Sequence, residues 1–570
     1  MSSAKKVIIV GGVAGGATAA ARLRRLDERA HIVLLERGEH ISFANCGLPY
    51  HVGGVIPERQ QLLLLTPERM RERQRIDVRV RHEVLRIDRA AREVEVRNLA
   101  TGELLRERYD HLVLSTGAAP LRPPIPGIDL PGILTLRNLP DMDAILAAAK
   151  ARPQGRAVVV GGGFIGLELA ENLRHRGLEV TLVEMAEQVM TPLDRELAAV
   201  VHHALRAEGV ALRLQAAVTA FEQTGDGLAV RLRSGEALGA DLVCLSIGVR
   251  PEARLAAEAG LTLGPRGGVR VDATLLTSDP HISAIGDVAE VPALAQEDTT
   301  WVPLAGPANR QGRLVADRIA GLPVRYGGVQ ATGIAKVFSL TAGSTGKSEA
   351  TLHREGVPFR SVLTHGASHA GYYPGATPLA LKLLFSPEGR ILGAQAVGRE
   401  GVDKRLDVLA TALRLGASVD DLAGLELAYA PPFSSAKDPV NILGYVAGNL
   451  LRGEERFVDW RTVLAHDPAH AVLLDVREQS EREQHGYLQG SVHIPLGQLR
   501  ERHGELRADR PVHVYCQVGQ RAHAAVRLLT QLGYDAANVS GGFRTVQAIR
   551  DDLAACAAGP GLGASPGAAA

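Results

Sequence analysis

Cysteine is scarce in this sequence: only four of its 570 residues are cysteine. No two of them form a Cys-x-x-Cys pair, and none has the spacing to histidine that is typical of a metal site. A disulfide-stabilised scaffold and structural zinc are therefore not indicated, and no metal ligands are expected. This cysteine usage favours a reducing, cytoplasmic setting.

Long apolar runs and an excess of one charge are also missing. No run reaches the roughly 18 apolar residues that a membrane helix requires. The apolar part of MSSAKKVIIVGG is too short for a signal peptide and is better interpreted as a first strand. The 64 Lys and Arg residues nearly equal the 63 Asp and Glu residues, so neither nucleic acid nor a membrane is expected as a partner.

Two segments of the chain share one order of elements, strand, glycine turn, helix and strand, which is typical of a βαβ unit. The first has a strand at VIIV, a helix over residues 17–26 and a strand over 32–35. The second has a strand at VVV after Ala157, a helix over 167–176 and a strand over 180–183. Two Rossmann-like nucleotide-binding domains are therefore predicted, in a chain long enough for about three to five units.

The first glycine turn lacks the middle glycine of the full G-x-G-x-x-G pattern. It can still bring a pyrophosphate close to backbone N–H groups at a helix N-terminus. Glu36 ends the second strand, where an acceptor for a ribose hydroxyl belongs, and Arg37 adjoins it. The residues of the turn expected to contact the nucleotide are Gly11, Gly12, Ala14, Gly15 and Gly16.

The second glycine turn matches the full pattern through Gly161, Gly163 and Gly166. Glu184 closes the second strand of this unit. A carboxylate there accepts from an unphosphorylated ribose and repels a 2′-phosphate, so NADH is favoured over NADPH.

Two further segments, LVLSTGAAP at 112–120 and TSDPHISAIGDV at 277–288, resemble flavin-contact motifs of the pyridine nucleotide-disulfide oxidoreductases. The resemblance covers roughly residues 5–448 and implies FAD and NAD domains followed by a dimerisation domain. It implies FAD contacts for Thr116 and Gly117, and for Asp287 at the ribityl chain. It also implies a helix over about 308–318, starting at Ala308, whose N-terminus points at the isoalloxazine.

Cys46 lies in SFANCGLPY, downstream of the first glycine turn. Pro49 suits the first turn of a helix, and a helix N-terminus lowers the pKa of a thiol. No second cysteine lies nearby, so Cys46 must alternate alone between a thiolate and a sulfenate, mixed disulfide or persulfide. Peroxidases of the same family carry histidine in the first glycine turn, where this chain has Ala14, which argues against peroxide as the main substrate.

The segment SFANCGLPY resembles the single-cysteine coenzyme A-disulfide reductases. The resemblance implies coenzyme A as bound thiol or substrate. It also implies a homodimer whose active site is completed by the second subunit, through the tyrosines of HAGYYPGA and LAYAPPFSSAKD. These are Tyr372 and Tyr429, whose phenols could stabilise a departing thiolate. Contacts with the substrate are implied for Arg22, Arg25, Ser42, Phe43 and Asn45.

The last part of the chain has its own alternation of strands and helices and resembles a rhodanese domain. Its loop from Cys516 to Arg521 is six residues long, and backbone N–H groups can converge there on the cysteine sulfur. The Cys-x4-Arg spacing is one residue shorter than the loop of related phosphatases and too small for phosphate. Cys516 is therefore expected to carry sulfane sulfur.

The expected fold class is α/β, with an α+β dimerisation domain and a C-terminal α/β rhodanese domain. The predicted boundaries are FAD 1–120 and 250–330, NAD(H) 121–249, dimerisation 331–448, linker 449–458, rhodanese 459–557 and a disordered tail 558–570. The expected activity is NAD(P)H-dependent reduction of coenzyme A disulfide, coenzyme A persulfide or polysulfide. An NADH oxidase with a sulfur-sensing rhodanese module is the alternative.

Overall fold

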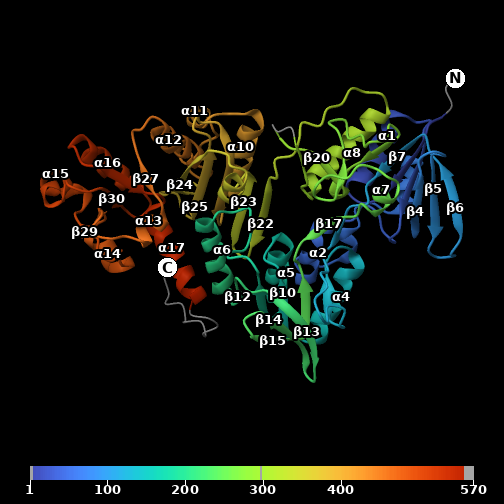
Figure 1. The fold of residues 1–570 in the computed structure, drawn as a ribbon, viewed down its shortest axis with the longest axis horizontal. Coiled ribbons are helices and arrows are strands. Elements are labelled where there is room, and N and C mark those ends of the chain that lie inside the picture. Colours follow the sequence, from blue (N-terminus) through green and yellow to red (C-terminus); the bar gives the residue numbers. More distant parts are fainter. Residues whose placement is uncertain (1–3, 295–297, 558–570) are drawn as a thin grey trace. The chain divides into compact units, whose positions relative to one another are not determined.

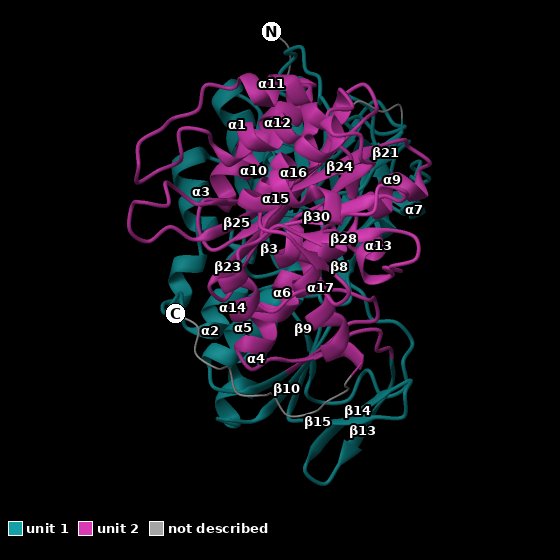
Figure 2. Cartoon of the chain, turned by 90° about the vertical axis from the view of Figure 1, so that its left-hand side faces the viewer, with its two compact units in different colours: residues 1–180, 218–331 teal, residues 181–217, 332–570 magenta. Residues whose placement is uncertain are grey.

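The computed structural model describes residues 4–294 and 298–557, and the predicted tail lies outside them (Figure 1). The chain forms two compact units, Met1–Val180 with Val218–Ala331 and Thr181–Ala217 with Thr332–Ala570 (Figure 2). The boundaries of the units after Val180 and Ala217 fall inside the segment predicted to bind NAD(H).

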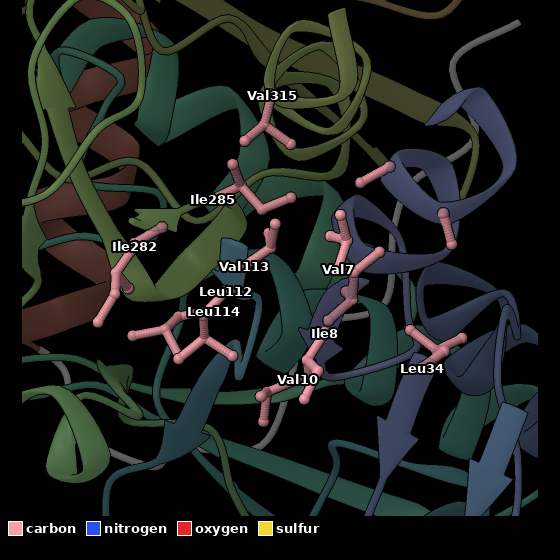
Figure 3. Close-up of a cluster of buried hydrophobic side chains, with 14 of the residues drawn as sticks. Val7, Ile8, Val10, Leu34, Leu112, Val113, Leu114, Ile282, Ile285 and Val315 are labelled. Atoms are coloured by element: carbon pink, nitrogen blue, oxygen red, sulfur yellow. The ribbon is translucent and has the colours of Figure 1, made fainter. Parts of the chain in front are cut away.

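Unit 1 contains a five-stranded parallel sheet in the order β19-β7-β1-β2-β3. Its strands are β1 (Lys6–Val10), β2 (His31–Glu36), β3 (Asp77–Val80), β7 (His111–Leu114) and β19 (Ile282–Ala284). The inner strands are buried on both faces, which explains why they are continuous apolar runs. Figure 3 shows their side chains packed with Val315 of α8 (Ala305–Ile319).

Smaller elements complete the first nucleotide-binding part of unit 1. The helices are α1 (Gly15–Leu26), α2 (Leu48–Gly53), α3 (Pro67–Gln74) and α7 (Arg254–Glu258). The strands are β4 (His82–Asp88), β5 (Glu93–Asn98), β6 (Leu104–Arg108), β8 (Ala118–Pro120), β17 (Val249–Pro251), β18 (Val269–Arg270), β20 (Ala289–Pro292) and β21 (Thr299–Thr300). Short 3₁₀ turns lie at Asn45–Gly47, Arg59–Leu62 and Gly286–Val288.

The second glycine turn joins β10 (Arg156–Val160) to α5 (Phe164–His175). Strand β10 pairs in parallel with β16 (Leu242–Leu245), which pairs with β9 (Ile133–Thr135). The other elements of this part are α4 (Leu139–Ala151), β13 (Val218–Thr224), β14 (Gly227–Leu232) and β15 (Ala237–Ala240). The chain continues into β11 (Glu179–Val183), α6 (Arg195–Ala207) and β12 (Ala211–Arg213).

Unit 2 contains an antiparallel sheet in the order β22-β23-β26-β25-β24. Its strands are β22 (Gly333–Val337), β23 (Leu340–Gly346), β24 (Arg360–Ala367), β25 (Pro378–Phe385) and β26 (Ile391–Gly398). The helices that accompany it are α9 (Glu349–Arg354), α10 (Val402–Leu415), α11 (Val419–Gly424) and α12 (Pro439–Leu451).

The C-terminal part of unit 2 is a parallel sheet in the order β27-β31-β30-β28-β29. Its strands are β27 (Phe457–Val458), β28 (Val472–Asp475), β29 (Val492–His493), β30 (Val512–Tyr515) and β31 (Ala536–Val539). The helices are α13 (Trp460–Leu464), α14 (Gln479–His485), α15 (Leu499–Arg502), α16 (Gln520–Gln531) and α17 (Gly542–Ala557), with 3₁₀ turns at Leu496–Gln498 and His503–Glu505. The residues predicted as a linker include the end of α12 and all of β27.

The predicted helices are present, but three of them begin earlier than the sequence pattern indicates. Helix α1 begins at Gly15, α5 at Phe164 and α8 at Ala305. Glycines fall in or beside these first turns, and because glycine is a weak helix former, the apolar periodicity starts later than the helix itself. Among residues 4–294 and 298–557, no helix combines the length and apolar character needed to cross a bilayer.

Candidate functional site

The first glycine turn closes tightly between β1 and α1. Gly11 has φ +101°, and a Cβ added to it would lie 2.1 Å from the carbonyl oxygen of Ser115. A Cβ on Gly16 would lie 1.9 Å from the carbonyl oxygen of Gly11. No side chain caps α1, and its first turn holds no acidic residue, so its N-terminal N–H groups can receive an anion.

Glu36 reaches back from the end of β2 to this turn. Its carboxylate accepts hydrogen bonds from the backbone N–H of Gly12 at 2.9 Å and of Gly38 at 2.7 Å. Arg37 instead forms an ion pair with Glu252 at 2.6 Å. The turn, the uncapped helix and Glu36 together fit the phosphates and ribose of a dinucleotide.

Thr116, one of the predicted cofactor contacts, is held by two residues that belong to no sequence motif. Its hydroxyl donates to the carbonyl oxygen of Glu252 at 2.8 Å, and its own carbonyl accepts from Arg137 at 3.1 Å. Gly117 has φ +75°, and its carbonyl accepts from the N–H of Glu252 at 2.9 Å. Glu252 and Arg137 carry no local motif, so only the fold identifies them.

Asp287 lies half-buried in a 3₁₀ turn before α8. Burial raises the pKa of its carboxyl, which the positive charge of Arg137 partly offsets. Among the described residues, the carboxylate makes no hydrogen bond, so its oxygens are available to hydroxyl groups of a cofactor. Ala308 lies in the first turn of α8, whose N-terminus has neither a side-chain cap nor an acidic residue. These features fit the flavin end of FAD.

The second glycine turn has one open position between two closed ones. A Cβ on Gly161 would lie 2.3 Å from the carbonyl oxygen of Ser246, and one on Gly166 would lie 1.9 Å from that of Gly161. Gly163 has no neighbouring atom within 4 Å of such a Cβ. This open face suits the close approach of a pyrophosphate. In unit 2, Glu184 follows β11 and accepts from the N–H of Ala186 at 2.8 Å.

Cys46 is a free, exposed cysteine in a 3₁₀ turn directly before α2. Its thiol contacts the side-chain oxygen of Asn45 at 3.8 Å. The N–H of Ser42 donates to the carbonyl of Gly12 at 2.9 Å, and Phe43 pairs with Leu63 in an isolated antiparallel bridge. The backbone therefore ties the cysteine loop to the first glycine turn.

The expectation of a lowered thiol pKa at Cys46 is wrong. Burial of the loop, the carboxylate of Glu168 and the carboxylate of Asp287 raise the pKa of Cys46. Glu168 lies on α5, accepts a hydrogen bond from the hydroxyl of Tyr50 at 3.4 Å, and has its own pKa raised to about 7 by burial and by Glu171. Helix α2 has only six residues, so its dipole is weak against two nearby carboxylates.

The two arginines predicted to contact substrate lie in different settings on α1. Arg22 forms an ion pair with Asp317 of α8 at 2.7 Å. Arg25, in the last turn of α1, is exposed and makes no hydrogen bond or ion pair among the described residues. Arg25 is therefore the better placed of the two to receive a phosphate.

The structure brings Tyr372 and Tyr429 together. Their hydroxyl oxygens are 2.9 Å apart, although 57 residues separate them in the sequence. The two side chains are 75% and 48% exposed, which is unusual for large aromatic residues. The hydrogen bond between the two hydroxyl groups raises the pKa of Tyr372.

Cys516 lies at the start of the predicted loop, directly after β30, and is only 1% exposed. Its sulfur accepts the backbone N–H of Gly519 at 3.2 Å. Its carbonyl accepts the N–H of Phe543 at 2.8 Å. A Cβ on Gly542 would lie 2.6 Å from that carbonyl, so this glycine allows α17 to approach the loop.

Two arginines brace the loop from its sides. Arg521 makes a two-pronged ion pair with Glu481 of α14, with N–O distances of 2.5 and 2.6 Å. Arg477 is fully buried, pairs with Asp475 at 2.9 Å, and donates to the side-chain oxygen of Gln517 at 3.2 Å. The predicted arginine of the loop is held by a carboxylate that the sequence motif did not reveal, and it also interacts with the thiol of Cys516.

Four features together define a class of protein. They are two glycine turns at helix N-termini, an exposed cysteine tied to the first turn, and a second cysteine whose sulfur accepts a backbone N–H. It is an oxidoreductase with two nucleotide sites, joined to a thiol-bearing α/β unit.

Comparison with known proteins gives this class a family. Residues 5–301 match the pyridine nucleotide-disulphide oxidoreductases, 333–439 match their dimerisation domain, and 460–548 match the rhodanese-like domain. Coenzyme A disulfide reductase of Staphylococcus haemolyticus (strain JCSC1435) is 37% identical over 78% of this chain and 100% of its own length. The chain belongs to the pyridine nucleotide-disulphide oxidoreductase family.

Two solved structures resemble nearly the whole chain. Reduced Bacillus anthracis CoADR-RHD has a TM-score of 0.94 and 49% identity, covering 96% of this chain and 99% of that one. The NAD-dependent persulfide reductase from A. fulgidus has a TM-score of 0.89 and 36% identity, covering 95% and 99%. The predicted fold class is confirmed, and the protein is a flavoprotein oxidoreductase that uses FAD and NAD(P)H and carries a rhodanese-like domain.

Proposed function

We propose that this enzyme uses NADH to reduce coenzyme A persulfide or coenzyme A disulfide through Cys46, and that Cys516 carries sulfane sulfur. The observation that carries the proposal is the presence in one chain of two free cysteines in different surroundings. Cys46 is exposed beside the FAD turn, and Cys516 is buried with a backbone N–H on its sulfur. The first suits electron transfer and the second suits storage of a persulfide.

The chemistry at Cys46 follows from a single thiol. Its thiolate attacks the outer sulfur of coenzyme A persulfide, a Cys46–sulfur bond forms, and the coenzyme A thiolate leaves. FAD, when bound, would supply two electrons from NADH, which would reduce the Cys46 persulfide to thiolate and hydrosulfide. The thiol must give up its proton before it attacks, and burial, Glu168 and Asp287 oppose this by raising the pKa of Cys46.

The surrounding residues are assigned roles on the same basis. Glu184 favours NADH by repelling a 2′-phosphate. Arg25 is proposed to bind a phosphate of coenzyme A, with Ser42, Phe43 and Asn45 lining the thiol end. The hydroxyl pair of Tyr372 and Tyr429 is proposed to protonate the leaving thiolate in the active site of a second subunit, so the enzyme works as a homodimer.

One anaerobic assay separates these possibilities. Purified enzyme is given NADH with coenzyme A persulfide or coenzyme A disulfide, and sulfide, free thiol and NADH loss are measured; a parallel aerobic sample measures oxygen uptake. We expect sulfide release with the wild type and none with Cys46→Ser. Turnover of the disulfide, with no sulfide released from the persulfide, would remove the persulfide role. Oxygen uptake as the main activity would favour an NADH oxidase.

The role of Cys516 needs its own variant. Cys516→Ser is expected to abolish the formation of thiocyanate from thiosulfate and cyanide while leaving reduction by NADH intact. Unchanged consumption of thiosulfate or polysulfide in Cys516→Ser would instead favour a rhodanese unit that only senses sulfur.

A further inference from the structure

A buried carboxylate lies outside the matched rhodanese-like segment yet contacts residues that hold its cysteine loop. Glu455 lies between α12 and β27, five residues before the match begins at Trp460, and is 2% exposed. Strand β27 pairs in parallel with β31, with Phe457 opposite Asn538. This pairing brings the joining segment into the C-terminal sheet.

Both oxygens of Glu455 are used. One accepts the side-chain N–H of Asn538 at 2.7 Å, and the other lies 2.7 Å from Nδ1 of His523. Asn538 also donates to the carbonyl of Gly519 at 3.0 Å, and the backbone N–H of His523 donates to the same carbonyl at 2.9 Å. Two of the partners of Glu455 therefore hold one peptide of the Cys516 loop.

Gly519 is the residue whose N–H reaches the sulfur of Cys516. Its φ of +95° is a conformation that only glycine adopts without strain, and Gly519 is the N-cap of α16. Fixing its carbonyl fixes the turn that aims its N–H at the sulfur. If Glu455 were lost, the side chain of Asn538 would be free to turn away from Gly519, and the loop would lose one of its two anchors at this point.

We propose that Glu455 is a positioning residue for the Cys516 loop, so that the sulfur-carrying unit includes part of the segment joining it to the dimerisation domain. The inference rests on the proposed role of Cys516 and extends it to a residue that does not touch the sulfur. The reaction concerned is attack of the Cys516 thiolate on the outer sulfur of thiosulfate. A Cys516–sulfur bond forms, the S–S bond of thiosulfate breaks, and sulfite leaves with the electron pair.

Two substitutions at Glu455 separate positioning from charge. The hydrogen bond that His523 donates to Glu455 raises the pKa of His523. Glu455→Ala and Glu455→Gln both remove the carboxylate and its effect on the pKa of His523, so the two substitutions change the charge beside the loop equally. Only Gln can still accept from Asn538 and donate to His523. The other charged pairs at the loop, Arg521 with Glu481 and Arg477 with Asp475, stay unchanged.

The experiment uses the full-length enzyme. Thiosulfate and cyanide serve as probes for sulfur transfer, and mass spectrometry of the Cys516 peptide follows its alkylation by iodoacetamide across pH. We expect Glu455→Ala to lower kcat for thiocyanate formation about tenfold and to move the midpoint of the alkylation profile up by about one pH unit, the effect of losing a charged hydrogen bond. Glu455→Gln should stay within about threefold of the wild type. The control is Glu454→Gln, which removes the adjacent carboxylate, paired with the exposed Arg452 at 3.0 Å.

Three outcomes decide the proposal. An unshifted alkylation midpoint in Glu455→Ala, or an equal shift in Glu455→Gln, would overturn it. If Glu455→Ala does not fold, Asn538→Ala removes only the link to Gly519 and should reproduce both effects. A shifted midpoint in an enzyme whose wild type makes no thiocyanate would support the positioning role and refute the proposed sulfur carrier.

Discussion

At the scale of single residues, the environment of Cys46 is unusual because negative charge surrounds a thiol that must ionise. Burial raises its pKa, Glu168 and Asp287 raise it further, and Glu168 itself has a pKa of about 7. As pH rises through 7, Glu168 gains charge and disfavours the Cys46 thiolate further. The reactivity of Cys46 therefore depends on its own proton and on that of Glu168.

Glu168→Gln is expected to lower the pKa of Cys46, because the amide removes one of the two negative charges that raise it and keeps an acceptor for Tyr50. The measurement is the rate of Cys46 alkylation as a function of pH. We expect the midpoint to fall by about one unit, the scale of a single charge at a partly exposed site.

The matched control for that substitution is Glu58→Gln, which removes an exposed carboxylate from the loop after α2 and should leave the midpoint in place. A midpoint that rises or stays fixed in Glu168→Gln would show that burial of the loop, not Glu168, sets the pKa of Cys46.

The sequence predicts functional residues well where those residues are close together in the chain. The loop from Cys516 to Arg521 could be located from its spacing. In the structure, the backbone N–H of Gly519 donates to the sulfur of Cys516. Glu168 and Glu455 could not be assigned in the same way. Glu455 acts on a loop more than 60 residues away, and no local pattern links it to that loop.

At the scale of elements, the second glycine turn combines two opposite requirements. Gly161 has φ +107° and no room for a side chain, whereas Gly163 has an extended backbone with φ −77° and open space. Gly161 lets the turn pass close to the backbone of Ser246, which follows β16, and the open space at Gly163 is proposed to receive a ligand.

Paired alanine substitutions should separate these two roles. Gly161→Ala is expected to lower the free energy of unfolding by about 2 kcal/mol or more, through steric clash and backbone strain. Gly163→Ala should leave unfolding unchanged and raise KM for NADH about tenfold, because its methyl group occupies the path of the pyrophosphate. Urea unfolding and steady-state kinetics measure the two effects. Equal destabilisation by both substitutions would contradict the assignment.

Element prediction was accurate for type and less so for ends. The strand at VIIV and the helix after each glycine turn are present because apolar periodicity records burial. The sequence predicts a linker where the short strand β27 lies, because Phe457 and Val458 are two apolar residues among charged ones. Its pairing with β31 depends on residues about 80 positions later, which no local window contains.

At the scale of the whole molecule, the last helix is fixed within unit 2 by a buried ionic cluster. Asp552 of α17 contacts Arg195 at 2.5 Å, Arg206 at 2.6 Å and Nδ1 of His202 at 3.0 Å, all on α6. His202 accepts the N–H of Val189 through Nε2 at 3.1 Å, so Nδ1 carries the hydrogen that is donated to Asp552. The rhodanese-like domain is thereby joined to a helix that follows the second glycine turn in the chain.

The sequence order alone could not show this junction. The sequence motifs identify four segments: the two glycine turns, the Cys46 loop and the Cys516 loop. The comparisons confirm the families of the domains that contain them. The residues that join these parts are ordinary charged side chains on helix surfaces. Asp551 and Asp552 are adjacent in sequence, yet Asp552 is 3% exposed and Asp551 is exposed. Only the docking of α17 on α6 distinguishes the two carboxylates.

Asp552→Asn should therefore weaken unit 2 in a way that depends on pH. Burial alone would raise the pKa of Asp552, but the hydrogen bond from His202 and the charges of Arg206 and Arg195 lower it to about 2. Since the folded value lies below the usual value near 4, the carboxylate contributes about 2 kcal/mol above pH 4, and this contribution is lost as pH falls toward 2.

At pH 7, Asp552→Asn is expected to cost about 3 kcal/mol, because two arginines lose their partner. Between pH 4 and 2, the stability of the variant should fall less steeply than that of the wild type. Urea unfolding at several pH values measures both effects, with Asp551→Asn as the control that should follow the wild type. If Asp552→Asn and Asp551→Asn behaved alike, the cluster would not be what holds α17 on α6.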